Sequence, residues 1–183
     1  MNTQFNLKAS ILLAALFCVP VAQAAMTSND EYKANKTRIA ADYKSEKAAC
    51  GAMNGNAKDI CVEEAKGREK VALAEGEYAH TGSAADSKKV IIAKAESNYA
   101  IAKEKCDDRS GNDKDVCVKE AKAVEAKILA DVKLSKKIDS AVKDDVQTKR
   151  DADYKVRVEK CDSQSGDAKA SCVANAKASV GKD

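Results

Sequence analysis

The chain carries one sequence unit three times, and this repetition constrains the fold more than any other feature. Each unit has two cysteines separated by ten residues, with a tyrosine seven residues before the first cysteine. The cysteine pairs are Cys50 and Cys61, Cys106 and Cys117, and Cys161 and Cys172. The repeated tyrosines are Tyr43, Tyr99 and Tyr154, and a glycine lies in the middle of the segment between the two cysteines of each unit. We interpret the pattern as an internal triplication with offsets of 56 and 55 residues.

Each unit has the pattern of a helix, a short turn and a second helix. In the second copy, apolar residues recur every three or four positions, which places them on one helix face. Gly111 can adopt the left-handed conformation that ends a helix, and Asn112 is expected to cap the next one. Gly55 and Asn56 are expected to do the same in the first copy. We predict an all-α fold of three helical hairpins in an elongated, Ala-rich repeat or bundle. Six helices are expected, at about 29–52, 57–79, 84–108, 113–136, 140–163 and 168–180.

The two linkers between repeats differ in their turn signals. His80 to Ser83 forms a clear break, and Ser83 followed by Asp86 is typical of a fresh helix start. Residues 135–140 have a weaker signal, so the fourth and fifth helices can also be continuous. The third copy lacks the acidic residue that follows the turn in the other two. We therefore expect the third hairpin to be the least ordered.

The first two dozen residues have the pattern of an export leader. Lys8 is followed by an apolar run over 11–19, and Ala22-Gln23-Ala24 is a typical cleavage site. The predicted organisation is a leader over 1–24 and repeats over 25–80, 81–136 and 137–183. The apolar run is too short for a retained membrane span, and Phe17 before Cys18 disfavours lipidation. We expect a periplasmic or secreted protein.

Export makes structural disulfides the favoured interpretation of the cysteines. Pairing within each repeat clamps every hairpin near its turn. A zinc site would need closer ligand spacing than this, and the chain has only one histidine. A thiol-redox catalyst would need a Cys-x-x-Cys motif, which is absent. We therefore predict the pairs Cys50–Cys61, Cys106–Cys117 and Cys161–Cys172, with no metal and no cofactor.

The stretches Tyr43 to Lys66 and Tyr99 to Lys122 resemble small exported proteobacterial proteins of unknown function. Those proteins are sometimes loosely labelled TolA-like cell-envelope proteins. The resemblance implies a helical fold and an extracytoplasmic compartment, and it implies no activity. The hairpins also resemble, in form only, the Cys-x9-Cys hairpins of the coiled-coil-helix-coiled-coil-helix family.

Other candidate residues favour structural interpretations. The tyrosines are expected in the core and His80 in a solvated loop. Lys58, Lys114 and Lys169 recur beside the turns, where they fit either a solvated first turn or a binding stripe. No nucleophile elbow, phosphate-binding loop or zincin motif is present.

Charge and composition limit the possible partners. The chain has 32 basic and 29 acidic residues, interspersed, which gives no long-range field for nucleic acid. We predict a non-enzymatic structural or protein-interaction protein of the cell envelope, with other envelope proteins as partners and no stable membrane span after leader cleavage. The alternative is a binding module or holdase-like chaperone for unfolded chains or metal ions. The oligomeric state stays open.

Overall fold

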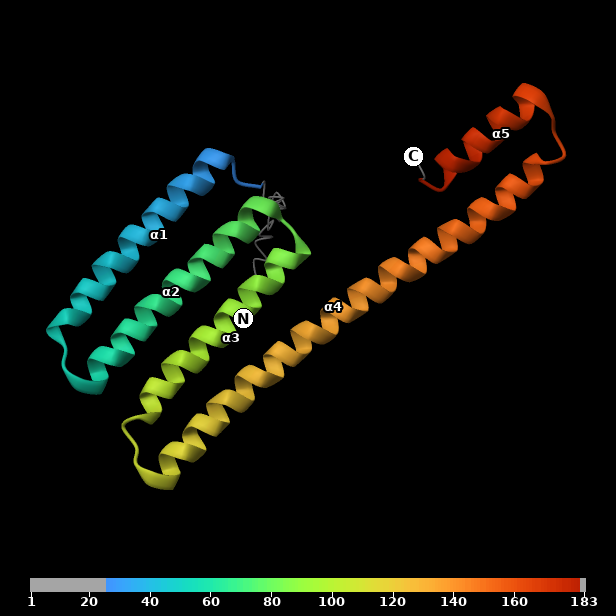
Figure 1. Ribbon diagram of the computed structural model, residues 1–183. Coiled ribbons are helices and arrows are strands. Elements are labelled where there is room, and N and C mark those ends of the chain that lie inside the picture. The colour runs from blue at the N-terminus through green and yellow to red at the C-terminus, as the bar shows by residue number, and fades with distance from the viewer. Residues whose placement is uncertain (1–25, 182–183) are drawn as a thin grey trace, which may run out of the picture.

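A computed structural model describes residues 26–181 as helices joined by short turns (Figure 1). The elements are α1 (Asn29–Ala49), the 3-10 turn η1 (Cys50–Ala52), α2 (Gly55–Thr81), α3 (Ala84–Cys106), α4 (Gly111–Cys161) and α5 (Gly166–Ser179). The all-α prediction is confirmed, and there is no strand between residues 26 and 181. The expected leader over 1–24 lies outside the described residues.

A disulfide joins the two helices of each hairpin beside its turn. The bonds are Cys50–Cys61, Cys106–Cys117 and Cys161–Cys172, each with a Cα–Cα distance of 5.7 Å. The first residue of each second helix is a glycine with positive φ, between 55° and 57°. A side chain would strain this left-handed backbone, so the glycine permits the tight turn that brings the cysteines together. The three hairpins and their pairing agree with the sequence prediction.

The core consists of cystine and alanine, with few large side chains. Cys50, Cys106 and Cys161 are the largest fully buried side chains in the described chain. Small residues elsewhere let neighbouring helices approach closely. A Cβ added at Gly67 of α2 would lie 3.1 Å from the Cβ of Ser97 in α3. A thin layer of helices results, because small side chains fill the space between them and each disulfide fixes one end.

The helices form a layer in which each one packs only on its neighbours in sequence. α1, α2, α3 and the first half of α4 lie side by side, while the second half of α4 runs on beyond them (Figure 1). There α5 folds back along the end of α4 and packs on no other described helix. The repeats therefore have local contacts only, as in other repeat proteins.

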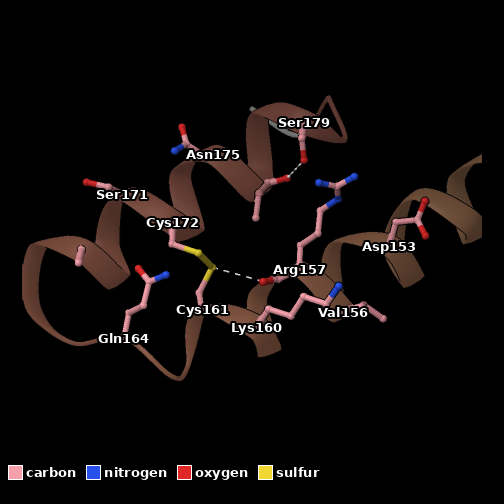
Figure 2. Close-up of a pocket in the computed structure, with 12 residues that line it drawn as sticks. Asp153, Val156, Arg157, Lys160, Cys161, Gln164, Ser171, Cys172, Asn175 and Ser179 are labelled. Carbon is pink, nitrogen blue, oxygen red and sulfur yellow. Dashed lines mark hydrogen bonds between the residues drawn. A yellow bond between two sulfur atoms is a disulfide. The ribbon is translucent and has the colours of Figure 1, made fainter.

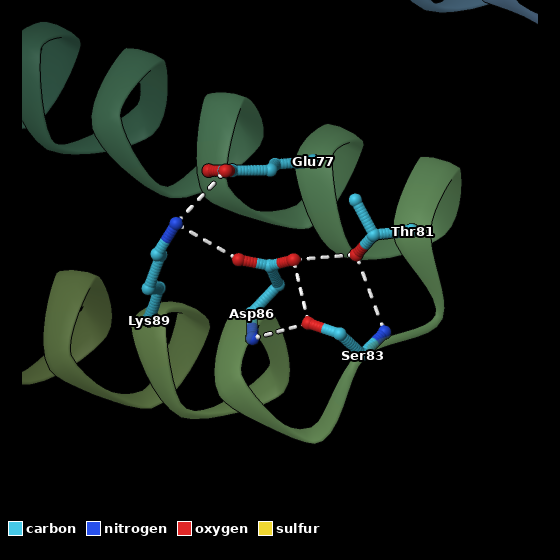
Figure 3. A network of polar contacts seen from close by, with 5 residues as sticks. All are labelled: Glu77, Thr81, Ser83, Asp86 and Lys89. Atoms are coloured by element: carbon cyan, nitrogen blue, oxygen red, sulfur yellow. Dashed lines mark hydrogen bonds and ion pairs between the residues drawn. The ribbon is translucent and has the colours of Figure 1, made fainter. Parts of the chain in front are cut away.

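A polar network fixes the sharp turn between α2 and α3 (Figure 3). Gly82 ends α2 with φ 62°, and the Ser83 hydroxyl accepts a hydrogen bond from the Asp86 backbone N–H at 3.0 Å. The Asp86 carboxylate accepts hydrogen bonds from the hydroxyls of Thr81 and Ser83 and pairs with Lys89. Lys89 first, and then the two hydroxyls, hold the pKa of Asp86 well below its ordinary value. The turn is thus closed by charge-assisted hydrogen bonds around one carboxylate.

The second linker has no such network, and α4 is one continuous helix of 51 residues. Residues 135–140 contain no glycine, and Ser135 and Ser140 are followed three positions later by Ile138 and Lys143. Neither serine can build the carboxylate-centred cap seen at Ser83. The expected helices 113–136 and 140–163 are therefore joined, and the described residues contain five α-helices where six were expected.

The capping prediction at the hairpin turns is wrong. Asn54, Ser110 and Ser165 occupy the N-cap positions, and none of them makes a side-chain capping bond. Asn56 instead donates to the backbone oxygen of Glu104 at 2.9 Å and to the carboxylate of Asp108 at 2.7 Å. Asn56 therefore ties the first hairpin to the second, because both acceptors lie at the second hairpin's turn. By contrast, the capping box of Ser28 and Glu31 at the start of α1 is present.

Removal of the third disulfide is expected to melt α5 selectively. α5 has 14 residues and packs only on α4, and an isolated helix of that length is marginal in water. The double substitution Cys161→Ala/Cys172→Ala should reduce the helical circular dichroism signal, because closing such a loop contributes about 3 kcal/mol. The matched pair Cys106→Ala/Cys117→Ala should lower the melting temperature with a smaller loss of helix, since α3 also packs on α2. Equal helical signals in both variants would contradict the selective melting of α5.

Asp86 should make the fold acid-sensitive. Because its pKa in the folded state lies below the ordinary value of 3.8, its stabilising contribution is complete above that pH and is lost as pH falls below it. Asp86→Asn should lower the melting temperature at neutral pH and should flatten its decline between about pH 5 and pH 2. Asp30→Asn is the control, because that side chain is 98% exposed. If the melting temperatures of both variants declined equally steeply as the pH fell, this role for Asp86 would be excluded.

Candidate functional site

The lysines beside the hairpin turns make contacts within the turns. Lys114 forms an ion pair with Asp107 at 3.1 Å, and Lys169 forms the matching pair with Asp162 at 2.9 Å. In the first repeat the position of these aspartates is occupied by Gly51. Both pairs cross the turn from the start of one helix to the end of the helix before it. The lysine contacts therefore favour turn closure over a binding stripe.

The repeated tyrosines are half-buried, at the edges of the helix contacts. The ammonium of Lys122 lies 4.6 Å from the centre of the Tyr99 ring, and Lys47 lies 5.7 Å from that of Tyr43. These are cation–π contacts of the protein's own residues. The tyrosines were expected in the core but are only half-buried, because cystine and alanine occupy the interior.

His80 does not lie in a solvated loop, as the sequence analysis expected. It belongs to the last turn of α2 and is half-buried. Its ring stacks on Tyr32 of α1 with a centroid distance of 4.7 Å, and Nδ1 lies 2.8 Å from the backbone oxygen of Thr27. His80 therefore fastens the start of α1 to the end of α2. Tyr32 is not repeated in the other two units, so the repeat pattern contains no signal for this contact.

The cysteines offer no free thiol to catalysis or metal binding, because all six between residues 26 and 181 are paired in disulfides. Within that same range, no group of three or more histidine, cysteine, aspartate or glutamate residues is arranged to hold a metal ion.

A groove lies between the end of α4 and α5 (Figure 2). It has a volume of about 890 Å³, and the Cys161–Cys172 disulfide joins the two helices across it. Charged side chains come from α4, including Asp153, Arg157 and Lys160, while α5 contributes smaller polar ones such as Asn175. The groove is open and mixed in charge. Such a lining suits contact with a polar protein surface more than enclosure of a small molecule.

The middle of α4 is the most unusual surface of the described chain. Every residue from 136 to 150 is exposed, and α3 reaches this segment through the ion pair of Lys88 with Asp139. Large apolar side chains nevertheless line one face of it: Leu134 is 56% exposed, Ile138 53% and Val142 56%. With Val146, they recur every four residues, which places them in a continuous row.

We call the exposed apolar residues along this face of α4 the α4 stripe. Its members are Val116, Val124, Leu134, Ile138, Val142, Val146 and Val156. The side of α4 that packs on α3 is different, and it includes Ile128 and the buried Val132. A row of exposed apolar side chains along one helix face is typical of a surface that binds another helix. The apolar spacing alone did not predict this surface, because spacing does not distinguish a covered helix face from an exposed one.

Comparison with known proteins does not assign a function to this chain. No protein-family model, no curated protein and no solved structure matches the chain. None of the helices between residues 26 and 181 is long and apolar enough to cross a membrane.

Proposed function

We propose that this protein is a non-enzymatic structural protein of the bacterial cell envelope, exported to the periplasm, which engages other envelope proteins through α4. The observation that carries the proposal is the α4 stripe, where large apolar side chains are exposed along one face of α4. The disulfide-bonded hairpins serve as rigid ends that hold this helix extended. Between them, α4 spans roughly 75 Å at 1.5 Å per residue.

Two observations support export. Lys8, the following apolar run and Ala22-Gln23-Ala24 form the pattern of a cleavable leader. Three intramolecular disulfides persist in oxidising compartments and are rare where thiols are kept reduced. The resemblance to small exported proteobacterial proteins points in the same direction.

Export is tested by fusing alkaline phosphatase, which needs oxidation to become active, to the C-terminus. We expect phosphatase activity in cells that express the full chain and none when residues 1–24 are deleted. Peptide mapping of the exported protein without reduction should recover Cys50–Cys61, Cys106–Cys117 and Cys161–Cys172. Activity without the leader, or disulfides between repeats, would contradict the proposal.

The binding role is tested by photo-crosslinking in the periplasm. A photoreactive amino acid at Val142 should form adducts with a second protein molecule, because this position lies in the α4 stripe. The same amino acid at Gln147 is the matched control, since it lies about half a turn away around the same bare segment. Equal yields at both positions, or none at either, would remove the support for α4 as a binding surface.

A further inference from the structure

The repeats provide an internal template for what should cover α4. The first half of α4 is the counterpart of α2, and its second half is the counterpart of α3. α2 and α3 pack against each other as antiparallel neighbours, joined by the turn at Gly82. The two halves of α4 are instead parts of one helix. The surfaces equivalent to the α2–α3 contact are therefore present in α4 without their internal partner.

The buried centre of the α2–α3 contact has exposed counterparts in α4. Gly67 and Ser97 are buried against each other, and Ile101 lies beside them. Their counterparts are Ala123, Ala152 and Val156, which are all exposed. The exchange is balanced in size, because alanine for glycine adds a methyl group while alanine for serine and valine for isoleucine each remove an atom. The two halves of α4 thus retain shapes suited to the same contact.

The charges of the α2–α3 contact are also retained. Four ion pairs cross that contact: Glu64–Lys105, Glu75–Lys94, Glu77–Lys89 and Lys70–Glu96. Three of them have complementary counterparts in α4, namely Glu120 with Lys160, Asp131 with Lys149, and Lys133 with Asp144. In the third, both signs are reversed together. Only the counterpart of the Lys70–Glu96 pair is lost, because Ala126 stands at the position of the lysine.

These partners cannot meet within a continuous α4. Glu120 and Lys160 are 40 residues apart, which is roughly 60 Å along a helix. A chain that folds back would need a turn near residue 138, where the glycine and the carboxylate-centred network of the first linker are absent. A second copy of the chain, lying antiparallel along α4, supplies both partners without any break in the helix.

The positions fit a twofold axis near Ser140. Glu120 and Lys160 each lie 20 residues from Ser140, and Asp131 and Lys149 each lie nine residues from it. Six residues of the stripe have the same symmetry: Ile138 and Val142 are two residues away, Leu134 and Val146 six, and Val124 and Val156 sixteen. In an antiparallel pair of α4 helices centred on Ser140, each of these residues lies level with its counterpart from the other chain. The apolar row and the ion pairs thus define the same register.

We propose that two copies of this protein associate through α4, antiparallel and centred on Ser140, so that the second half of one α4 covers the first half of the other. This inference rests on the proposed function and identifies a second copy of the chain as a partner of α4. The contact continues the layer of Figure 1, with the partner's second half of α4 in the place that α3 takes beside α2. Each Asp131–Lys149 and Glu120–Lys160 pair is formed twice, because the contact is symmetric.

The test uses the oxidised protein without its leader, prepared in light and ¹⁵N-labelled forms and mixed. A carbodiimide, which joins only carboxylates and amines in direct contact, should link Glu120 to Lys160 and Asp131 to Lys149. Half of the linked peptides should combine light and heavy chains, as expected for random association between two copies. Linked peptides that are always of one isotope would show a folded-back single chain and would overturn the proposal.

Charge reversal tests the register. Lys149→Asp should weaken the dimer about tenfold in sedimentation equilibrium, because it creates two repulsive contacts per dimer. Adding Asp131→Lys should restore the dissociation constant to within about threefold of the original, since the pair is rebuilt with opposite signs. Lys143→Asp, the same charge change about a third of a turn around the helix from Lys149, should leave it unchanged. A dissociation constant that Lys149→Asp leaves unchanged would contradict this register.

The mass of the protein separates this inference from the proposed function. A single-chain mass throughout the micromolar range would overturn the second copy as partner. If Val142 still formed adducts with other proteins, the proposed envelope role would stand. If those adducts were also absent, both would fail.

Discussion

The disulfide beside each hairpin turn is the interaction on which the rest of the structure depends. Cystine supplies the largest fully buried side chains of the described residues, while most other buried positions are alanine or another small residue. A layer this thin buries little apolar surface per residue, so the reduced freedom of the cross-linked unfolded chain carries much of the stability. Short helices such as α5 can persist because one end is covalently fixed. Disulfides therefore replace a core that the composition cannot provide.

One difference between two linkers gives the molecule its shape. At Gly82 a left-handed glycine, a serine cap and the Asp86 carboxylate turn the chain back on itself. At residues 135–140 these groups are missing, and the helix continues for 51 residues. The same repeat thus yields a packed pair of hairpins at one end and a separate hairpin at the other. Between them lies the bare segment of α4 on which both proposals rest.

Sequence reasoning predicted the hairpins and the cysteine pairing because these depend on local spacing that is repeated three times. It failed where contacts join segments that are distant in sequence. Asn56 was expected to cap its own helix, but it binds the turn of the next hairpin. His80 was expected in solvent, but it stacks on Tyr32 of another helix. The exposed row along α4 also depends on which neighbours a helix has, and that information is not contained in its own periodicity.

The continuity of α4 is the central claim, and a distance within one chain tests it most directly. Spin labels on unnatural amino acids at Lys127 and Lys155 leave the disulfides intact. Dilution with unlabelled protein removes distances between copies. A continuous helix predicts a narrow distribution near roughly 42 Å, from 28 residues at 1.5 Å each. A distribution near about 10 Å, the usual spacing of packed helices, would show that α4 breaks and folds back on itself.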